Sequence, residues 1–154
     1  MDFDAVLLRA QSGTPDGLAD LWTTYHPMVV RYLSVRFSGD AEDLASQVWI
    51  DVARNLHRFQ GESDEFRSWL FTIAHHRGVD ELRRTARRPK SSPLEDGSEP
   101  VASFVEGHLT PSQALDSALA LLRRLPADQA EAVGLRIIAD LDVSRLKLWL
   151  DEVL

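Results

Sequence analysis

The chain has 154 residues, which is enough for one domain of ordinary size or for a small domain with an additional fragment. It contains no cysteine, which excludes disulfides and zinc–thiolate sites, and its 44% hydrophobic and 27% charged residues are typical of a globular protein in water. The net charge of −7 is unevenly distributed, because residues 72–90 hold six basic and two acidic residues, whereas segments 1–71 and 91–154 are both acidic.

The sequence predicts neither a secretory signal nor a membrane span. Acidic residues stand at the N-terminus, where a signal peptide needs lysine or arginine. No apolar run approaches the roughly 20 residues that cross a bilayer. We therefore expect a cytoplasmic protein with no membrane partner.

Apolar residues spaced three and four apart predict two helices at the start of the chain. The first is short and begins at Phe3. The second follows Thr14 and Pro15, a capping residue and a proline at the first helical position. Its apolar stripe continues to Phe37, and Pro27 predicts a kink or a break within it.

Residues 41–56 form the most regular predicted helix, with Asp40 as its N-cap. One face is apolar. The opposite face carries Asp43, Ser46, Gln47, Arg54 and Asn55. The segment 59–65 then interrupts the helical pattern.

Residues 66–88 predict a long helix whose second half is strongly basic. Its charged and polar positions are His76, Arg77, Asp80, Arg83, Arg84, Arg87 and Arg88. Such a face suits a phosphate backbone, although arginines at a helix C-terminus also complement the helix dipole, and charge alone leaves both interpretations open. Asp80 lies one turn before Arg84, so we expect it to hold that arginine in place.

Phe66 and Trp69 stand at the start of this helix, beside the polar segment 59–65. Aromatic rings next to such a loop suit unstacked bases, but their helical spacing also fits a protein core, so both roles stay open. His75 and His76 are adjacent and point about 100° apart, which is wrong for two ligands of one metal. We expect no metal site and no cofactor.

The rest of the chain is predicted as a linker followed by short helices. Residues 89–110 are rich in proline, serine and acidic residues and predict a flexible acidic linker. Helices are expected at 111–124 and 126–139, with a capping box at Thr110–Gln113, and "DVSRLKLWLDEVL" predicts a last amphipathic turn or two. The expected fold class is all-α, because strand-like alternation is absent.

Three pieces, "AEDLASQVW", "FRSWLFTIA" and "VDELRR", occur in order across residues 18–88. This run resembles the polymerase-binding domain of bacterial RNA polymerase sigma factors, and is closest to the extracytoplasmic-function (ECF) group. The segment "ALALLRRLPADQAEAVGLRII" resembles the first part of the family's second domain. The resemblance implies a polymerase-binding and −10-element-recognition domain at 1–88, a linker at 89–110, and a partial second domain at 111–154 that lacks a helix-turn-helix.

The resemblance also implies site residues. Asp43, Ser46, Gln47 and Arg54 would contact the clamp of the largest subunit of core RNA polymerase. Relatives often carry Gln-Glu where this chain has Ser46-Gln47, which removes one anionic contact. Residues 60–66 would form a pocket for a flipped promoter base, and the helix from His76 to Arg88 would hold the upstream edge of the −10 element, in duplex and melted DNA.

We therefore expect a non-enzymatic transcription initiation factor that binds core RNA polymerase and recognises and melts the −10 element. The alternative is a polymerase-binding module without promoter-opening activity. A metal-dependent enzyme built on His57, His75, His76 and Asp80 is the third class, and it is the least supported by the spacing. An inhibitory anti-sigma partner is left open.

Overall fold

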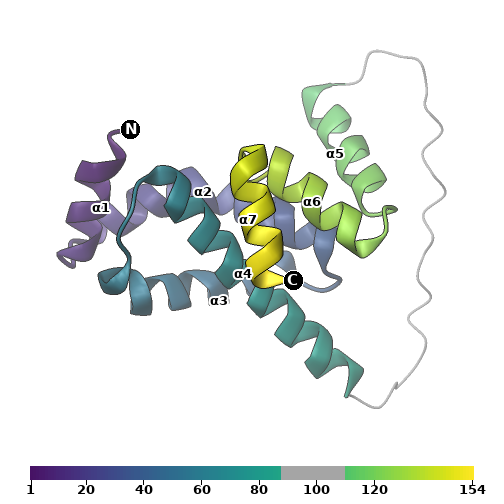
Figure 1. The fold of residues 1–154 in the computed structure, drawn as a ribbon, viewed down its shortest axis with the longest axis horizontal. Coiled ribbons are helices and arrows are strands. Elements are labelled where there is room, and N and C mark those ends of the chain that lie inside the picture. The colour runs from purple at the N-terminus through teal and green to yellow at the C-terminus, as the bar shows by residue number, and fades with distance from the viewer. Residues whose placement is uncertain (88–109) are drawn as a thin grey trace.

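The computed structural model of the protein describes residues 1–87 and 110–154, and this part is built from helices joined by short turns (Figure 1). The helices are α1 (Phe3–Gln11), α2 (Pro15–Arg36), α3 (Ala41–Asn55), the short 3-10 helix η1 (Leu56–Arg58), α4 (Ser63–Ala86), α5 (Pro111–Leu122), α6 (Ala127–Ile137) and α7 (Val143–Val153). The predicted all-α class is confirmed for these residues. Most of the predicted linker, and Arg88, lie outside them.

Two of the predicted helix starts are confirmed by their hydrogen bonds. The Asp40 carboxylate accepts the backbone N–H of Asp43 at 3.1 Å and caps α3. The Thr110 hydroxyl accepts the N–H of Gln113 at 3.2 Å, while the Gln113 side chain accepts the N–H of Thr110 at 3.0 Å. This reciprocal capping box satisfies two donors that a helix start would otherwise leave unpaired.

The structure changes two other predicted boundaries. The helix predicted at 66–88 begins earlier, at Ser63, because Glu62 and Glu65 form a capping box in the segment that interrupts the apolar pattern. Thr14 does not cap α2 with its side chain, and its hydroxyl instead donates to the backbone oxygen of Arg9. Pro15 does occupy the predicted position at the start of α2.

α2 continues through Pro27, so the predicted break is wrong. Its 22 residues form a single helix with Pro27 inside it. A proline within a helix costs about 3 kcal/mol, because one backbone hydrogen bond is lost and the ring crowds the preceding turn. Buried side chains on both sides of Pro27, including Leu21, Tyr25, Val29 and Leu33, offset this cost by packing in the core.

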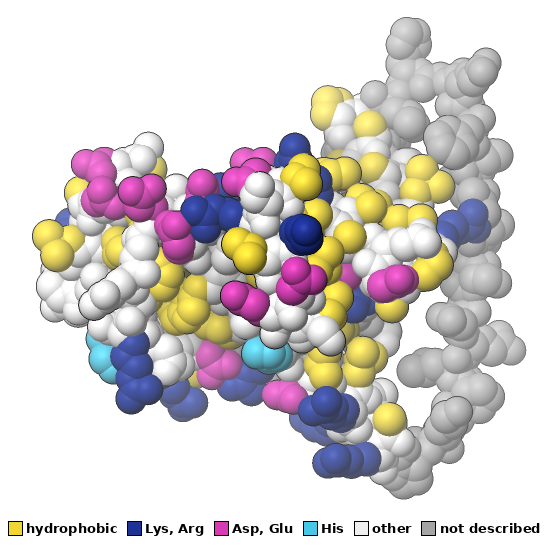
Figure 2. Space-filling model, in the orientation of Figure 1, with side chains coloured by type: hydrophobic (Ala, Val, Ile, Leu, Met, Phe, Trp, Pro, Cys, Tyr) yellow, Lys and Arg dark blue, Asp and Glu magenta, His cyan; other side chains and the backbone are white. Residues whose placement is uncertain are grey.

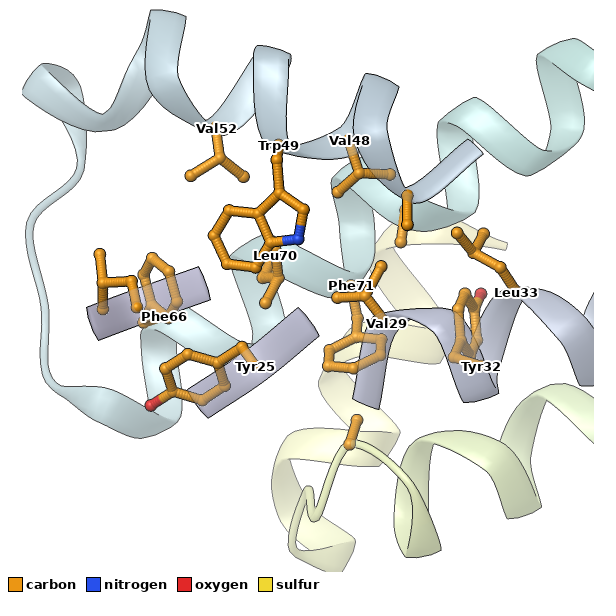
Figure 3. Close-up of a cluster of buried hydrophobic side chains, with 14 of the residues drawn as sticks. Tyr25, Val29, Tyr32, Leu33, Val48, Trp49, Val52, Phe66, Leu70 and Phe71 are labelled. Carbon is orange, nitrogen blue, oxygen red and sulfur yellow. The ribbon is translucent and has the colours of Figure 1, made fainter. Parts of the chain in front are cut away.

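The core lies between α2, α3 and α4 (Figure 3). α3 contributes Val48, Trp49 and Val52, which face Leu70 and its neighbours on α4. Phe71 of α4 meets Tyr32 of α2 edge to face, with the ring centroids 5.3 Å apart. Packing of this kind is favourable for aromatic pairs and helps to hold α4 against α2.

The C-terminal helices pack against the N-terminal ones. Leu135, Ala139, Leu141 and Trp149 belong to the same buried cluster as the core of α2, α3 and α4. In Figure 1, α7 (yellow) crosses α4, and α6 lies along α2. The division into domains at 1–88 and 111–154 stays a prediction, but the two parts are in direct contact.

Candidate nucleic-acid and polymerase interface

The second half of α4 extends beyond the packed helices and carries exposed positive charge. Figure 1 shows its end projecting from the body of the molecule, and Figure 2 shows dark blue side chains gathered there. The predicted site residues exposed on this stretch are His76, Asp80, Arg83, Arg84 and Arg87. Because few groups surround it, this end of α4 can approach a large polyanion from several sides.

Arg77 differs from the other arginines of α4, because it is fixed to α3. Its guanidinium donates two hydrogen bonds to the Asp51 carboxylate, at 2.5 and 2.7 Å, and both side chains are partly buried. These hydrogen bonds raise the pKa of Arg77. A bidentate pair of this geometry is well oriented. Arg77 therefore joins α4 to α3, in addition to lying next to the exposed arginines of α4.

Arg84 is paired with Glu81 and not with Asp80, so the expected Asp80–Arg84 pair is wrong. The Arg84 guanidinium lies 2.9 Å from the Glu81 carboxylate, three residues earlier on α4. Glu81 has one more methylene group than Asp80 and reaches the guanidinium along the helix surface. An exposed pair of this type contributes little to stability, so Arg84 remains available to another anion.

The structure places Phe66 in the core and corrects its predicted role in base stacking. The side chain is fully buried, with its ring centroid 5.1 Å from Tyr25 and 5.5 Å from Phe59. Trp69 is half-buried and packs against Phe59 and Phe66, with ring centroids 5.2 and 5.7 Å away. Of the two rings predicted to stack on bases, only that of Trp69 retains an exposed part.

The polar face of α3 is exposed as predicted from its periodicity. Asp43, Ser46 and Arg54 are exposed, and Gln47 is half-buried. The sequence reasoning missed Ile50, which is 50% exposed on the same helix. Ile50 lies three residues after Gln47 and four residues before Arg54, and this spacing predicts that it shares their side of the helix. This face therefore combines an apolar side chain with charged and polar ones.

The part of the chain that the structure describes holds no group of three histidine or acidic side chains placed to bind a metal ion. None of its helices is both long enough and apolar enough to span a membrane. The exposed side chains on α3 and α4 carry guanidinium, carboxylate and amide groups.

Known proteins are similar to this chain in sequence. The family model for Sigma-70 region 2 matches residues 21–88, from α2 to the end of the basic stretch. The ECF RNA polymerase sigma factor ShbA of Streptomyces griseus is 31% identical over 150 residues, covering 89% of this chain and 78% of that protein. This chain belongs to the ECF sigma factor family.

Two other relatives agree with this assignment. ECF RNA polymerase sigma factor SigD of Mycobacterium tuberculosis is 30% identical over 146 residues, covering 90% of the chain and 68% of the relative. ECF RNA polymerase sigma factor BldN of Streptomyces coelicolor is 31% identical over 140 residues, and the chain spans about half of its length, 53%. All three relatives are described as ECF RNA polymerase sigma factors.

The sigma factor contains a buried charged cluster that the sequence reasoning missed. Glu131 of α6 is 1% exposed and accepts hydrogen bonds from Tyr32 and Arg36 of α2. His75 of α4 lies 3.2 Å from the same carboxylate. Glu131 stands four residues before Leu135, so its spacing places it on the buried side of α6, but nothing local to it indicates which three groups surround the carboxylate.

Burial alone raises the pKa of Glu131, because a charged carboxylate loses its water on burial. Hydrogen bonds from His75, Tyr32 and Arg36, together with the positive charge of Arg36, more than offset this effect, so the pKa lies below its ordinary value of 4.5. Burial and the adjacent carboxylate raise the pKa of the Tyr32 hydroxyl well above its ordinary value. Tyr32 is therefore a hydrogen-bond donor at neutral pH.

A second charged contact joins α7 to the start of α4. The Arg145 guanidinium lies 2.7 Å from the Glu65 carboxylate and 3.7 Å from that of Asp64. The hydrogen bond from Arg145 lowers the pKa of Glu65. Both acidic residues belong to the segment expected to form the pocket for a promoter base, so α7 of this sigma factor contacts the predicted site directly.

Proposed function

We propose that this ECF sigma factor binds core RNA polymerase through α3, and recognises and melts the −10 promoter element through α4 and the segment before it. The observation that carries the proposal is the projecting end of α4, where Arg83, Arg84 and Arg87 are exposed in a chain of this family. Guanidinium groups neutralise phosphates and release their counterions. The protein would act on promoter DNA in the cytoplasm.

The exposed side of α3 supports the polymerase part of the proposal. Asp43, Ser46, Gln47 and Arg54 lie on a helix whose opposite side is buried against α2 and α4. A surface helix held from behind presents its polar groups in a fixed arrangement. We propose that these four residues contact the clamp of the largest polymerase subunit, with Ile50 as an apolar contact between them.

The half-buried ring of Trp69 and the segment 60–66 support the melting part of the proposal. Trp69 retains an exposed part beside this segment, whereas Phe66 supports it from within the core. Flipping a base out of the duplex costs a few kcal/mol. A pocket that holds the flipped base offsets that cost and selects among bases.

Run-off transcription with purified core polymerase tests the proposal. We expect a transcript that depends on this protein from a template library carrying varied −10 sequences. Core binding, measured in parallel by size-exclusion chromatography, separates the two activities. Retained core binding without any dependent transcript would instead indicate a polymerase-binding module that does not open promoters.

A further inference from the structure

α2 and α3 each expose one large apolar side chain to water. Trp22 of α2 is 46% exposed and Ile50 of α3 is 50% exposed, whereas the other large apolar side chains of these two helices are at least partly buried. An exposed indole ring presents a large apolar area, and tryptophan is among the residue types most enriched at the centres of protein interfaces. These two side chains are therefore candidates for contact with a partner.

The ring of Trp22 is held in place by a stack that joins α2 to α3. The indole lies 4.3 Å from the ring of His26, with an angle of 18° between the two planes. The His26 side chain is 12% exposed, and its Nε2 lies 3.0 Å from the carboxylate of Glu42 in the first turn of α3. Because each of these groups restrains the next, the indole is oriented before any partner binds. Such pre-organisation reduces the entropy that is lost on binding.

α3 runs antiparallel to α2. Residues 37–40 form a short turn between the two helices. Just after the end of α3, the backbone oxygen of Leu56 accepts a hydrogen bond at 3.0 Å from the Gln11 side chain of α1, and Ala10 of α1 lies against Gly17 near the start of α2. The end of α3 is therefore near the start of α2.

The contact between His26 and Glu42 determines which residues of α2 and α3 are neighbours. Ser46 and Ile50 follow Glu42 at four-residue spacing, so they lie on one side of α3 and lead toward the start of α2. Trp22 precedes His26 by about one turn, in the same direction. Trp22, Glu42, Ser46 and Ile50 therefore belong to one surface, which we call the α2–α3 surface.

The composition of the α2–α3 surface suits a protein partner. Apolar side chains at the centre of a surface, with polar groups around them, are typical of protein–protein interfaces. Glu42 and Asp43 are exposed at one end of this surface, and their carboxylates repel the phosphate backbone of a nucleic acid. The surface also continues into the exposed side of α3 that is proposed to contact the polymerase clamp. A partner with an apolar pocket beside a basic group fits these features.

We propose that Trp22 anchors the contact with core RNA polymerase, so that the polymerase-binding surface extends from α3 onto α2. This inference rests on the proposed function of α3. The exposed part of the indole enters an apolar pocket of the polymerase clamp, with Ile50 beside it, and a basic group of the clamp lies near Glu42 and Asp43. The stack on His26 keeps the indole in the orientation that the pocket accepts.

Hydroxyl-radical footprinting of the full chain tests the contact in the unchanged protein. Trp22 is exposed, whereas Trp49 and Trp149 are buried and serve as internal references for the fold. We expect core polymerase alone to slow the oxidation of Trp22 by about fivefold or more, because residues at the centre of an interface are shielded from water. Promoter DNA without polymerase should leave the oxidation of Trp22 unchanged.

Substitution of Trp22 tests how much the contact contributes to binding. We expect Trp22→Ala to weaken binding to core polymerase by about tenfold or more, and Trp22→Phe, which keeps an aromatic ring, to weaken it by less than about threefold. Leu8→Ala is the matched control, because Leu8 is a 70% exposed apolar residue on α1, outside the α2–α3 surface, and should leave binding unchanged. Surface plasmon resonance measures binding. Circular dichroism should show an intact fold, since Trp22 is not part of the buried cluster.

The outcomes separate this inference from the proposed function. Unchanged oxidation of Trp22 in a complex with core polymerase would overturn the inference, while leaving the contact through α3 in place. Absence of any complex with core polymerase would overturn the proposed function and the inference with it. Protection of Trp22 without polymerase, increasing with protein concentration, would assign the α2–α3 surface to a second copy of the chain and would also overturn the inference.

Discussion

Gly78 lies where the ring of Phe37 presses against α4. A Cβ atom at this position would overlap the ring, and Phe37 is itself buried. The close approach brings the end of α2 against the middle of α4, five residues before Arg83. Glycine is therefore required here because any side chain would clash with Phe37, and not because the backbone has a positive φ.

We predict that Gly78→Ala destabilises the protein by about 1–2 kcal/mol, because overpacking outweighs the gain of helix propensity. Gly134→Ala is the matched control in α6, where the added Cβ would meet only Tyr32, at an ordinary 3.8 Å. That change is expected to be neutral or to stabilise by up to about 1 kcal/mol. Urea unfolding followed by circular dichroism measures both. A stable Gly78→Ala would show that Phe37 moves aside freely.

At the scale of the elements, α3 and α4 each have one buried and one exposed side. The sequence predicted these two helices well, because an apolar stripe at helical spacing determines both the helix and its buried side. It predicted single contacts less well. Phe66 lies at the loop junction, where spacing does not separate core from surface, and only the surrounding rings of Tyr25 and Phe59 place it inside. The partners of Arg77 and Glu131 come from other helices, and no local pattern reveals them.

For α4 we predict that the triple change Arg83→Ala, Arg84→Ala and Arg87→Ala weakens promoter binding and lowers its salt dependence. Each phosphate that the protein no longer neutralises reduces the slope of log K against log salt by about 1, so the slope should fall by up to about 3. Arg77 is left unchanged because it also holds α3. Fluorescence anisotropy at several salt concentrations measures the effect.

The control for this change is Arg31→Ala with Arg136→Ala, which removes exposed arginines from α2 and α6. The salt slope should then stay as in the unchanged protein. An equal fall of the slope in the control would mean that overall charge, and not the end of α4, attracts the DNA.

For α3 we predict that Asp43→Ala weakens binding to core polymerase by about tenfold, an effect typical of a charged residue at the centre of an interface. The fold should stand, because Asp43 uses only its backbone N–H in the cap formed by Asp40. Surface plasmon resonance measures core binding, with Asp151→Ala as a control at another exposed aspartate. A loss of helical circular dichroism would show instead that the Asp43 side chain is structural.

At the scale of the whole molecule, Glu131 of α6 links the C-terminal helices α5 to α7 to the N-terminal helices. The pKa of Glu131 is lower in the folded protein than its ordinary value, so its stabilising effect is present above about pH 4.5 and is lost as the pH falls through the lowered value. Tyr32 and Arg36 of α2 and His75 of α4 face the carboxylate, and protonation of Glu131 leaves the Arg36 charge uncompensated.

We predict that acid loosens the contact of the C-terminal helices with α2 and α4 before it unfolds α1 to α4. The indole N–H signals of two buried tryptophans report the two parts by NMR, Trp149 for the C-terminal helices and Trp49 for the N-terminal core. The Trp149 signal should leave its folded position at a higher pH than the Trp49 signal does, because the contact of the C-terminal helices includes the ionised Glu131. In Glu131→Gln the difference in stability between neutral and acidic pH should shrink. Simultaneous loss of both signals would contradict the prediction.

The bidentate pair between Arg77 and Asp51 fastens the helix proposed to meet the enzyme to the helix proposed to meet the promoter. With Gly78 pressed against Phe37 one residue further on, this joint has little freedom to bend. The distance and angle between the surfaces proposed for polymerase and for promoter DNA are then fixed in the free protein. In the proposed complex, the N-terminal helices would act as a rigid template that sets the position of polymerase on the promoter.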